Sequence, residues 1–186
     1  DGMSSTFSGI GTVRSGNLQL DGVLGGTLNI MGGSVLSGAG TAAGQLNLMP
    51  GAMLSPGNHS VASFAAGNAT FALGSNWRVD IQPNGASDRL EVAGSTVING
   101  GHIDVRAVSG SYSSSTTYRI IEAVSVIQNS AFTLSSDLAY LSPSLTYGVD
   151  FVDLKMVNNG ATAVTYSQTR NQRALARALD AVSISD

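Results

Sequence analysis

Two stretches of this chain repeat one another at a fixed offset of 18 residues. TLNIMGGSVLSG begins at Thr27 and QLNLMPGAMLSPG begins at Gln45. The aligned pairs are Leu28 with Leu46, Asn29 with Asn47, Ile30 with Leu48, Met31 with Met49, Gly33 with Gly51 and Leu36 with Leu54. Each copy alternates apolar and polar residues over short runs broken by Gly, Asn or Ser, which is typical of half-buried strands rather than helices.

A looser copy follows further along the chain. Phe71 and Leu73 align with Leu90 and Val92 at an offset of 19 residues. Short strands repeated about every 20 residues predict a solenoid. Leucine-rich repeats share this length, but their leucine spacing differs, so we expect an all-β parallel β-helix over residues 1–109, each repeat forming one rung.

The composition limits the classes of function. Hydrophobic residues make up 42% of the 186 residues, enough for one elongated domain with a real core. Only 11% of residues are charged, against about 25% in an ordinary soluble domain. The net charge of −3 gives no reason to expect nucleic acid as a partner. There is no cysteine, so no disulfide framework is available. The start, DGMSSTFSG, has no signal-peptide pattern, and we expect the chain to be a fragment of a longer protein.

The pattern changes near Gly110, where GSYSSSTT predicts a polar loop over residues 110–117. The strands expected after it, including one in ATAVTYS, look like hairpin or meander elements rather than rungs. They carry four of the five tyrosines, Tyr118, Tyr140, Tyr147 and Tyr166. Because an open solenoid end exposes an unpaired edge, we interpret residues 110–166 as a β cap.

The last segment, residues 167–186, predicts a short helix from Thr169 to Val182. Thr169 and Gln172 form a capping-box pair. The apolar face is formed by Leu175, Leu179 and Val182, and the basic face by Arg170, Arg173 and Arg177. A helix with so few apolar residues needs support from outside itself.

In this order, the pieces resemble the C-terminal end of the passenger of a bacterial autotransporter, the type V secretion family. The resemblance runs from about residue 38 to residue 186. It rests on LSPGN, GNATFALGSNWRVDI, SDRLEVAGSTVINGGHIDV, YRIIEA, YLSPSLTY, VDFVDLKM and the closing TRNQRALARALD. One departure is Ser130, where the family often has a glycine before the phenylalanine.

The resemblance implies a right-handed β-helix that ends in an autochaperone module. In the family, the passenger is exported through the periplasm and crosses the outer membrane through a translocator barrel formed by the segment that follows. The module folds first at the cell surface of the Gram-negative bacterium and templates the upstream rungs, while the terminal helix lies in the pore. Arg170, Arg173 and Arg177 would suit such a polar pore.

Aromatic clustering at the end of the solenoid suggests which residues form the folding nucleus. The predicted set is Trp77, Tyr118, Phe132, Tyr140, Leu141, Tyr147 and Phe151. The competing function is that of an adhesin, in which the rung faces bind a host surface or a second copy.

Enzyme classes find little support in the sequence. GAGTAAG lacks the spacing of a nucleotide-binding loop, and GxSxG does not occur. The two histidines, His59 and His102, are expected in a turn and on a polar strand face. Calcium-binding repeats are absent, and we expect neither metal nor cofactor.

A polysaccharide lyase or hydrolase is the most serious enzymatic alternative. It would need carboxylates and basic residues gathered on neighbouring rungs. The candidates for one outer ladder are Arg78, Asp80, Asp88, Arg89, Glu91, Asp104 and Arg106. A cross-strand charge ladder is the simpler interpretation of these residues.

Overall fold

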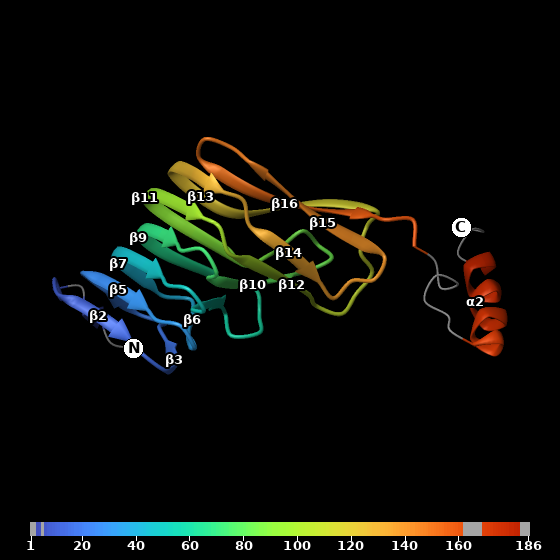
Figure 1. The fold of residues 1–186 in the computed structure, drawn as a ribbon, viewed down its shortest axis with the longest axis horizontal. Helices are drawn as coiled ribbons and strands as arrows, with labels where there is room; N and C mark the ends of the chain where they lie inside the picture. The colour runs from blue at the N-terminus through green and yellow to red at the C-terminus, as the bar shows by residue number, and fades with distance from the viewer. Residues whose placement is uncertain (1–2, 5, 162–168, 183–186) are drawn as a thin grey trace.

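The computed structural model describes residues 3–4, 6–161 and 169–182. In this part of the chain, a ten-stranded sheet and a six-stranded sheet enclose one core, and a single helix, α2, follows them (Figure 1). The larger sheet contains β1 (Met3–Ser4), β2 (Ile10–Val13), β4 (Val23–Leu24), β5 (Thr27–Ile30), β7 (Thr41–Leu48), β9 (Ser63–Phe71), β11 (Arg89–Asn99), β13 (Ser115–Ser130), β15 (Leu141–Tyr147) and β16 (Phe151–Asn158). The smaller sheet contains β3 (Gly16–Gln19), β6 (Ser34–Gly38), β8 (Met53–Pro56), β10 (Asn76–Ile81), β12 (His102–Ala107) and β14 (Thr133–Ser136). The prediction of an all-β chain is confirmed.

Consecutive strands alternate between the two sheets from β5 to β14. The order in the larger sheet is β4-β7-β9-β11-β13, and in the smaller sheet it is β3-β6-β8-β10-β12-β14, with all of these neighbours parallel. Strands with neighbouring numbers therefore face each other across the core. From β5 to β14, strands two apart in number are hydrogen-bonded side by side (Figure 1).

The 18-residue repeat corresponds to the strand register. Leu28 lies opposite Leu46 in the pairing of β5 with β7, and Leu36 lies opposite Leu54 in the pairing of β6 with β8. All four leucines are buried. The two copies of the repeat therefore lie side by side, with equivalent inward-facing residues next to one another in each sheet.

The alignment at an offset of 19 residues is wrong. Phe71 lies opposite Ile98, and Leu90 lies opposite Phe64. Leu73 is 71% exposed in the turn after β9. The reason is that longer turns after β8 and β10 lengthen the later repeats, so that a constant offset no longer matches the strand register.

The strands after residue 110 divide into two kinds. β13 pairs parallel with β11, and β14 pairs parallel with β12, so both continue the earlier pattern and are not the hairpin elements expected from the sequence. β15 and β16 do form an antiparallel hairpin, and β16 pairs antiparallel with β13. The expected change from parallel to antiparallel pairing therefore begins at β15, and the loop expected over residues 110–117 ends where β13 starts at Ser115. The division of the chain at residue 110 stays a prediction.

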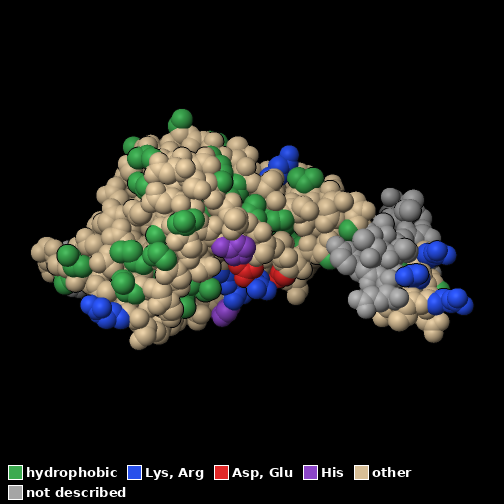
Figure 2. Space-filling view, viewed as in Figure 1, with side chains coloured by type: hydrophobic (Ala, Val, Ile, Leu, Met, Phe, Trp, Pro, Cys, Tyr) green, Lys and Arg blue, Asp and Glu red, His purple; other side chains and the backbone are tan. Residues whose placement is uncertain are grey.

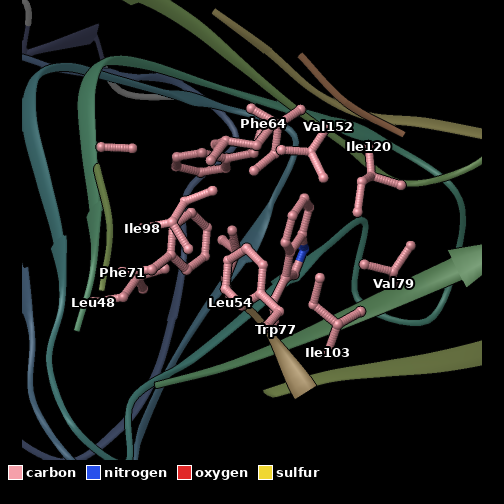
Figure 3. Close-up of a cluster of buried hydrophobic side chains, with 14 of the residues drawn as sticks. Leu48, Leu54, Phe64, Phe71, Trp77, Val79, Ile98, Ile103, Ile120 and Val152 are labelled. Atoms are coloured by element: carbon pink, nitrogen blue, oxygen red, sulfur yellow. The ribbon is translucent and has the colours of Figure 1, made fainter. Parts of the chain in front are cut away.

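The core lies between the sheets and is continuous from Leu28 to Met156. Its widest side chains come from both sheets and include Phe64, Phe71 and Trp77 (Figure 3). Burial alternates over Asn76–Val79 of β10 and His102–Val105 of β12, as the two-residue period of a strand with one solvated face requires. The alternation breaks at the end of β10, where Asp80 is buried between Val79 and Ile81.

The helix α2 runs from Arg170 to Val182, close to the predicted bounds. The predicted capping box is present: the amide of Gln172 donates to the Thr169 hydroxyl at 3.2 Å, and the Thr169 amide donates to the Gln172 side chain at 2.9 Å. The strand expected in ATAVTYS spans residues 161–167, and all of it after Ala161, including Tyr166, lies outside the described part of the chain.

Candidate functional site

Three aromatic side chains from separate segments meet in the core. The Phe71 ring at the end of β9 stacks on Trp77 of β10, with ring centroids 5.6 Å apart. The Phe132 ring, from the residue directly before β14, meets Phe71 edge to face at 5.1 Å. Because Phe132 follows β13 and the other two belong to earlier strands, this cluster joins the C-terminal strands to the preceding sheet pair.

The β15–β16 hairpin shares the same core. Val152, Leu154 and Met156 alternate along β16 and are fully buried, and Leu141 at the start of β15 is nearly so. The hydroxyl of Tyr147, the last residue of β15, accepts a hydrogen bond from the Phe132 amide at 2.9 Å. The hairpin is therefore tied to the aromatic cluster by packing and by a specific polar contact.

The hydroxyls of two further tyrosines form hydrogen bonds with backbone carbonyl groups at and near the turn after β10. The Tyr118 ring is buried, and its hydroxyl donates to the Gln82 carbonyl at 3.0 Å. The Tyr112 hydroxyl lies 2.8 Å from the carbonyl oxygens of Ile81 and Val108. Burial raises the pKa of Tyr112 to about 12 and also raises the pKa of Tyr118 and of Tyr147. All three hydroxyls consequently keep their protons through the neutral range.

Two of the predicted nucleus residues lie outside the core. Tyr140 is 47% exposed, so its expected burial is wrong, because it sits in the turn that leads into β15. Phe151 is half-buried and lies under the Arg119 guanidinium, whose central carbon is 4.1 Å from the ring centroid. Arg119 also binds Asp153 through two contacts of 2.7 and 3.3 Å. Trp77, Tyr118, Phe132 and Leu141 are buried as expected.

The predicted nucleus omits several buried residues of the same core. Phe71 and Phe64 are fully buried, as are Val152, Leu154 and Met156 on β16. The alternation of apolar residues along these strands is the sequence signal that indicates their burial. The role of the whole set as a folding nucleus stays a prediction.

The basic residues of α2 are solvent-exposed. Arg170, Arg173 and Arg177 all lie at the surface of the helix, which stands apart from the two sheets (Figure 1). Leu175, from the predicted apolar face, is also exposed, whereas Ala176 is buried. The side chains of Leu179 and Val182 lie outside the described part. No helix among the described residues is long and apolar enough to cross a membrane.

The predicted single charge ladder is wrong, since its members lie on two different sheets and two of them, Asp80 and Asp88, are buried. On β10 and β12, Arg78 binds Asp80 at 3.1 Å and Arg106 binds Asp104 at 2.8 Å. On the larger sheet, Arg89 binds Glu122 at 3.3 Å and lies 3.9 Å from Glu91. Asp88 is buried between the strands.

A shallow groove of about 370 Å³ lies along the charged residues of the smaller sheet. Its charged and histidine lining residues are His59, Arg78, Asp80, Arg106 and Asp137. Figure 2 shows a patch of acidic, basic and histidine side chains together on one face of the molecule. Within the described residues, no three His, Asp or Glu side chains are placed to hold a metal ion.

Ser135 lies close to His102 and Asp104, a grouping that the sequence did not reveal. The His102 ring has Nδ1 at 2.9 Å from the Thr133 hydroxyl and Nε2 at 2.9 Å from the Ser135 hydroxyl. Ser135 also donates to Asp104 at 3.1 Å. In a hydrolytic triad the carboxylate orients the histidine, whereas here it binds the serine, so this geometry does not support a serine hydrolase.

A larger groove, of about 720 Å³, lies on the outer face of the ten-stranded sheet. Its floor consists of small residues, among them Ala43, Ala65 and Gly67, and Arg89 and Glu122 lie along its lining. The strands bend here, because β7, β9 and β11 each shift register at this level. A methyl group on Gly44 would lie 1.9 Å from the Gly26 carbonyl oxygen, so the bend depends on glycine.

Comparison with known proteins finds a similarity at low identity. An extracellular serine protease of Serratia marcescens is 24% identical over 192 residues, an alignment that covers 98% of this chain and 18% of that protein. No family model matches the chain. The chain therefore spans less than a fifth of the length of the relative, and the activity of that whole protein is not assigned to it.

Proposed function

We propose that this chain is the C-terminal part of an autotransporter passenger, a parallel β-helix closed by an autochaperone cap. In this proposal the capped end folds first at the cell surface of a Gram-negative bacterium and templates the strands before it. The chain has no catalytic role of its own.

The observation that carries the proposal is the antiparallel hairpin at one end of a parallel stack. Alternation of strands between two sheets, with parallel neighbours two strands apart, is the connectivity expected of a parallel β-helix. The hairpin pairs with β13 and places Val152, Leu154 and Met156 in the core. A solenoid needs such a closed end, because its last strand otherwise exposes unpaired amides and carbonyls.

The edge strand of the larger sheet at this end supports the same function. β15 forms the edge of the larger sheet and contains Pro143, which has no amide proton to donate. Proline in an edge strand discourages further strand addition.

At the opposite end of the stack, β2 and β3 each leave one strand edge unpaired within the described residues. Within the described residues, β2 pairs only with β5 and β3 only with β6, so each has one side open for another strand. Ile10 on β2 is largely exposed. We propose that upstream rungs of the passenger pair there, so that folding proceeds from the closed end toward this open end.

The relative and the helix agree with this proposal. The similar Serratia protein is extracellular, which accords with a secreted or surface location. The exposed arginines of α2, Arg170, Arg173 and Arg177, suit a polar pore, and we propose that the helix leads into a translocator barrel that follows in the protein.

A second candidate function is adhesion or self-association. The observation in its favour is the groove of about 720 Å³ on the larger sheet, beside the exposed Val124. Saturable binding of the purified chain to a host-cell surface, to glycans or to itself would support this function over the first.

The proposed function is tested by surface display of the full secreted protein with one of two matched core changes. Leu154→Ala alters the hairpin, and Leu28→Ala alters the opposite end; both leucines are buried and both changes typically cost about 2–5 kcal/mol. If the capped end nucleates folding, Leu154→Ala lowers the amount of protease-resistant passenger far more than Leu28→Ala does. Equal losses, or normal display from Leu154→Ala, would overturn the proposal.

A further inference from the structure

Two carboxylates are buried together where β10 meets the start of β11. Asp88 is 0% exposed and Asp80 is 3% exposed. The Asp80 amide donates to Asp88 Oδ2 at 3.0 Å, and the Asp88 amide donates to the Asp80 carbonyl at 2.8 Å. These reciprocal contacts hold the two residues side by side.

Three of the four carboxylate oxygens of Asp80 and Asp88 accept a hydrogen bond, and the fourth accepts none. Asp88 Oδ1 accepts from the Ala62 amide at 2.9 Å, and Asp80 Oδ1 accepts from Arg78 Nε at 3.1 Å. Asp80 Oδ2 is buried and has no hydrogen-bond donor. A buried carboxylate oxygen without a donor is unfavourable, so this position calls for a proton or another donor.

The surrounding charges do not balance two buried anions. Arg78 is the only cation that binds either carboxylate among the described ion pairs. Arg106, opposite Asp80 on β12, is bound to Asp104. His59, from the turn before β9, and Asp137, from the turn after β14, line the same groove as Arg78 and Asp80. One guanidinium for two buried carboxylates leaves one negative charge in excess.

We infer that Asp88 carries a proton in the folded protein, because it is fully buried beside Asp80 and no cation binds it among the described ion pairs. Burial raises the pKa of Asp88 to about 7, the neighbouring Asp80 charge adds to the increase, and the Asp80 and Ala62 amides and Arg78 oppose it. The group that carries the proton also fastens the 57–62 turn, through Ala62, to the end of β10.

The consequence is folding that takes up a proton. An ordinary aspartate has lost its proton above about pH 4, whereas Asp88 in the folded protein keeps its proton until about pH 7. The stabilisation is fully present below about pH 4 and is lost as the pH rises through 7. This site goes beyond the proposed function and does not depend on it.

The direct test is a titration of the side-chain carboxyl carbons by NMR on the folded 186-residue chain between pH 5 and 8.5. The inference predicts that the Asp88 carboxyl carbon titrates near pH 7. In Asp80→Asn the midpoint of Asp88 moves to lower pH, because the neighbouring negative charge is gone. An Asp88 carboxyl carbon that stays fully ionised across this range would overturn the inference.

A second measurement uses stability and remains informative if the variant is weakened. The ratio of the unfolding constants of wild type and Asp88→Asn changes by up to tenfold per pH unit between about pH 5 and 7 and levels off above that. Asp21→Asn, which alters an exposed aspartate that also accepts a backbone amide, is the control and gives a constant ratio. A constant ratio for Asp88→Asn would contradict a proton held by Asp88 in the folded protein.

Discussion

The Tyr147 hydroxyl accepts a hydrogen bond from the Phe132 amide at 2.9 Å, across 15 residues of sequence. This contact joins the β15–β16 hairpin to Phe132, whose ring packs against Phe71 in the aromatic cluster. It links the antiparallel end to the parallel stack at the point where the pairing changes.

Removal of that hydroxyl tests how strongly the hairpin is held. Tyr147→Phe keeps the ring and leaves the Phe132 amide without its acceptor, so we expect a loss of about 1–2 kcal/mol in the free energy of unfolding. Urea denaturation of the purified chain measures it. Thr146→Val, which removes an exposed hydroxyl from the same strand, is the control and stays within about 0.5 kcal/mol. Equal effects of the two changes would refute a specific role for the contact.

Truncation of the aromatic cluster has a larger effect. Trp77→Ala removes a fully buried ring that stacks on Phe71, and we expect a loss of about 3–5 kcal/mol. Leu73→Ala, only four residues away but 71% exposed, should change stability by less than about 0.5 kcal/mol. A small effect of Trp77→Ala in the same denaturation experiment would show that the cluster is not part of the stabilising core.

The bend of the larger sheet depends on close approach of neighbouring backbones. A methyl group at Gly44 would meet the Gly26 carbonyl oxygen at 1.9 Å, so Gly44→Ala should force the strands apart and lower the melting temperature by several degrees. At Gly11 the nearest atom would be a Leu28 methyl at 3.5 Å, and Gly11→Ala should be tolerated. Thermal unfolding followed by circular dichroism compares the two, and equal tolerance would contradict the crowded bend.

The early repeat could be predicted because its turns are of equal length. Leu28 and Leu46 stand at the same place in successive copies, and the pattern of alternation is enough to put both in the core. The later register could not be predicted in this way. The turns after β8 and β10 lengthen, and only hydrogen bonding between distant strands determines that Phe71 faces Ile98.

The residues of the candidate site could be predicted only in part, because their contacts also depend on the register between distant strands. Aromatic character indicated burial for Trp77 and Phe132 but also for Tyr140, which a turn places at the surface. The charged character of Asp88 suggested an outer ladder, yet its backbone donors, Asp80 and Ala62, come from separate segments that sequence spacing does not bring together. Contacts between His102 and Ser135, 33 residues apart, depend on the same register.

In the proposed function, the hairpin end of the stack folds before the rest. Pulse-labelling hydrogen exchange during refolding of the 186-residue chain measures this order strand by strand. We predict that amides of β13, β15 and β16 become protected first and that protection then spreads through β11 and β9 to β5. Protection that appears first in β5 and β7, or in all strands at once, would contradict nucleation at the hairpin end.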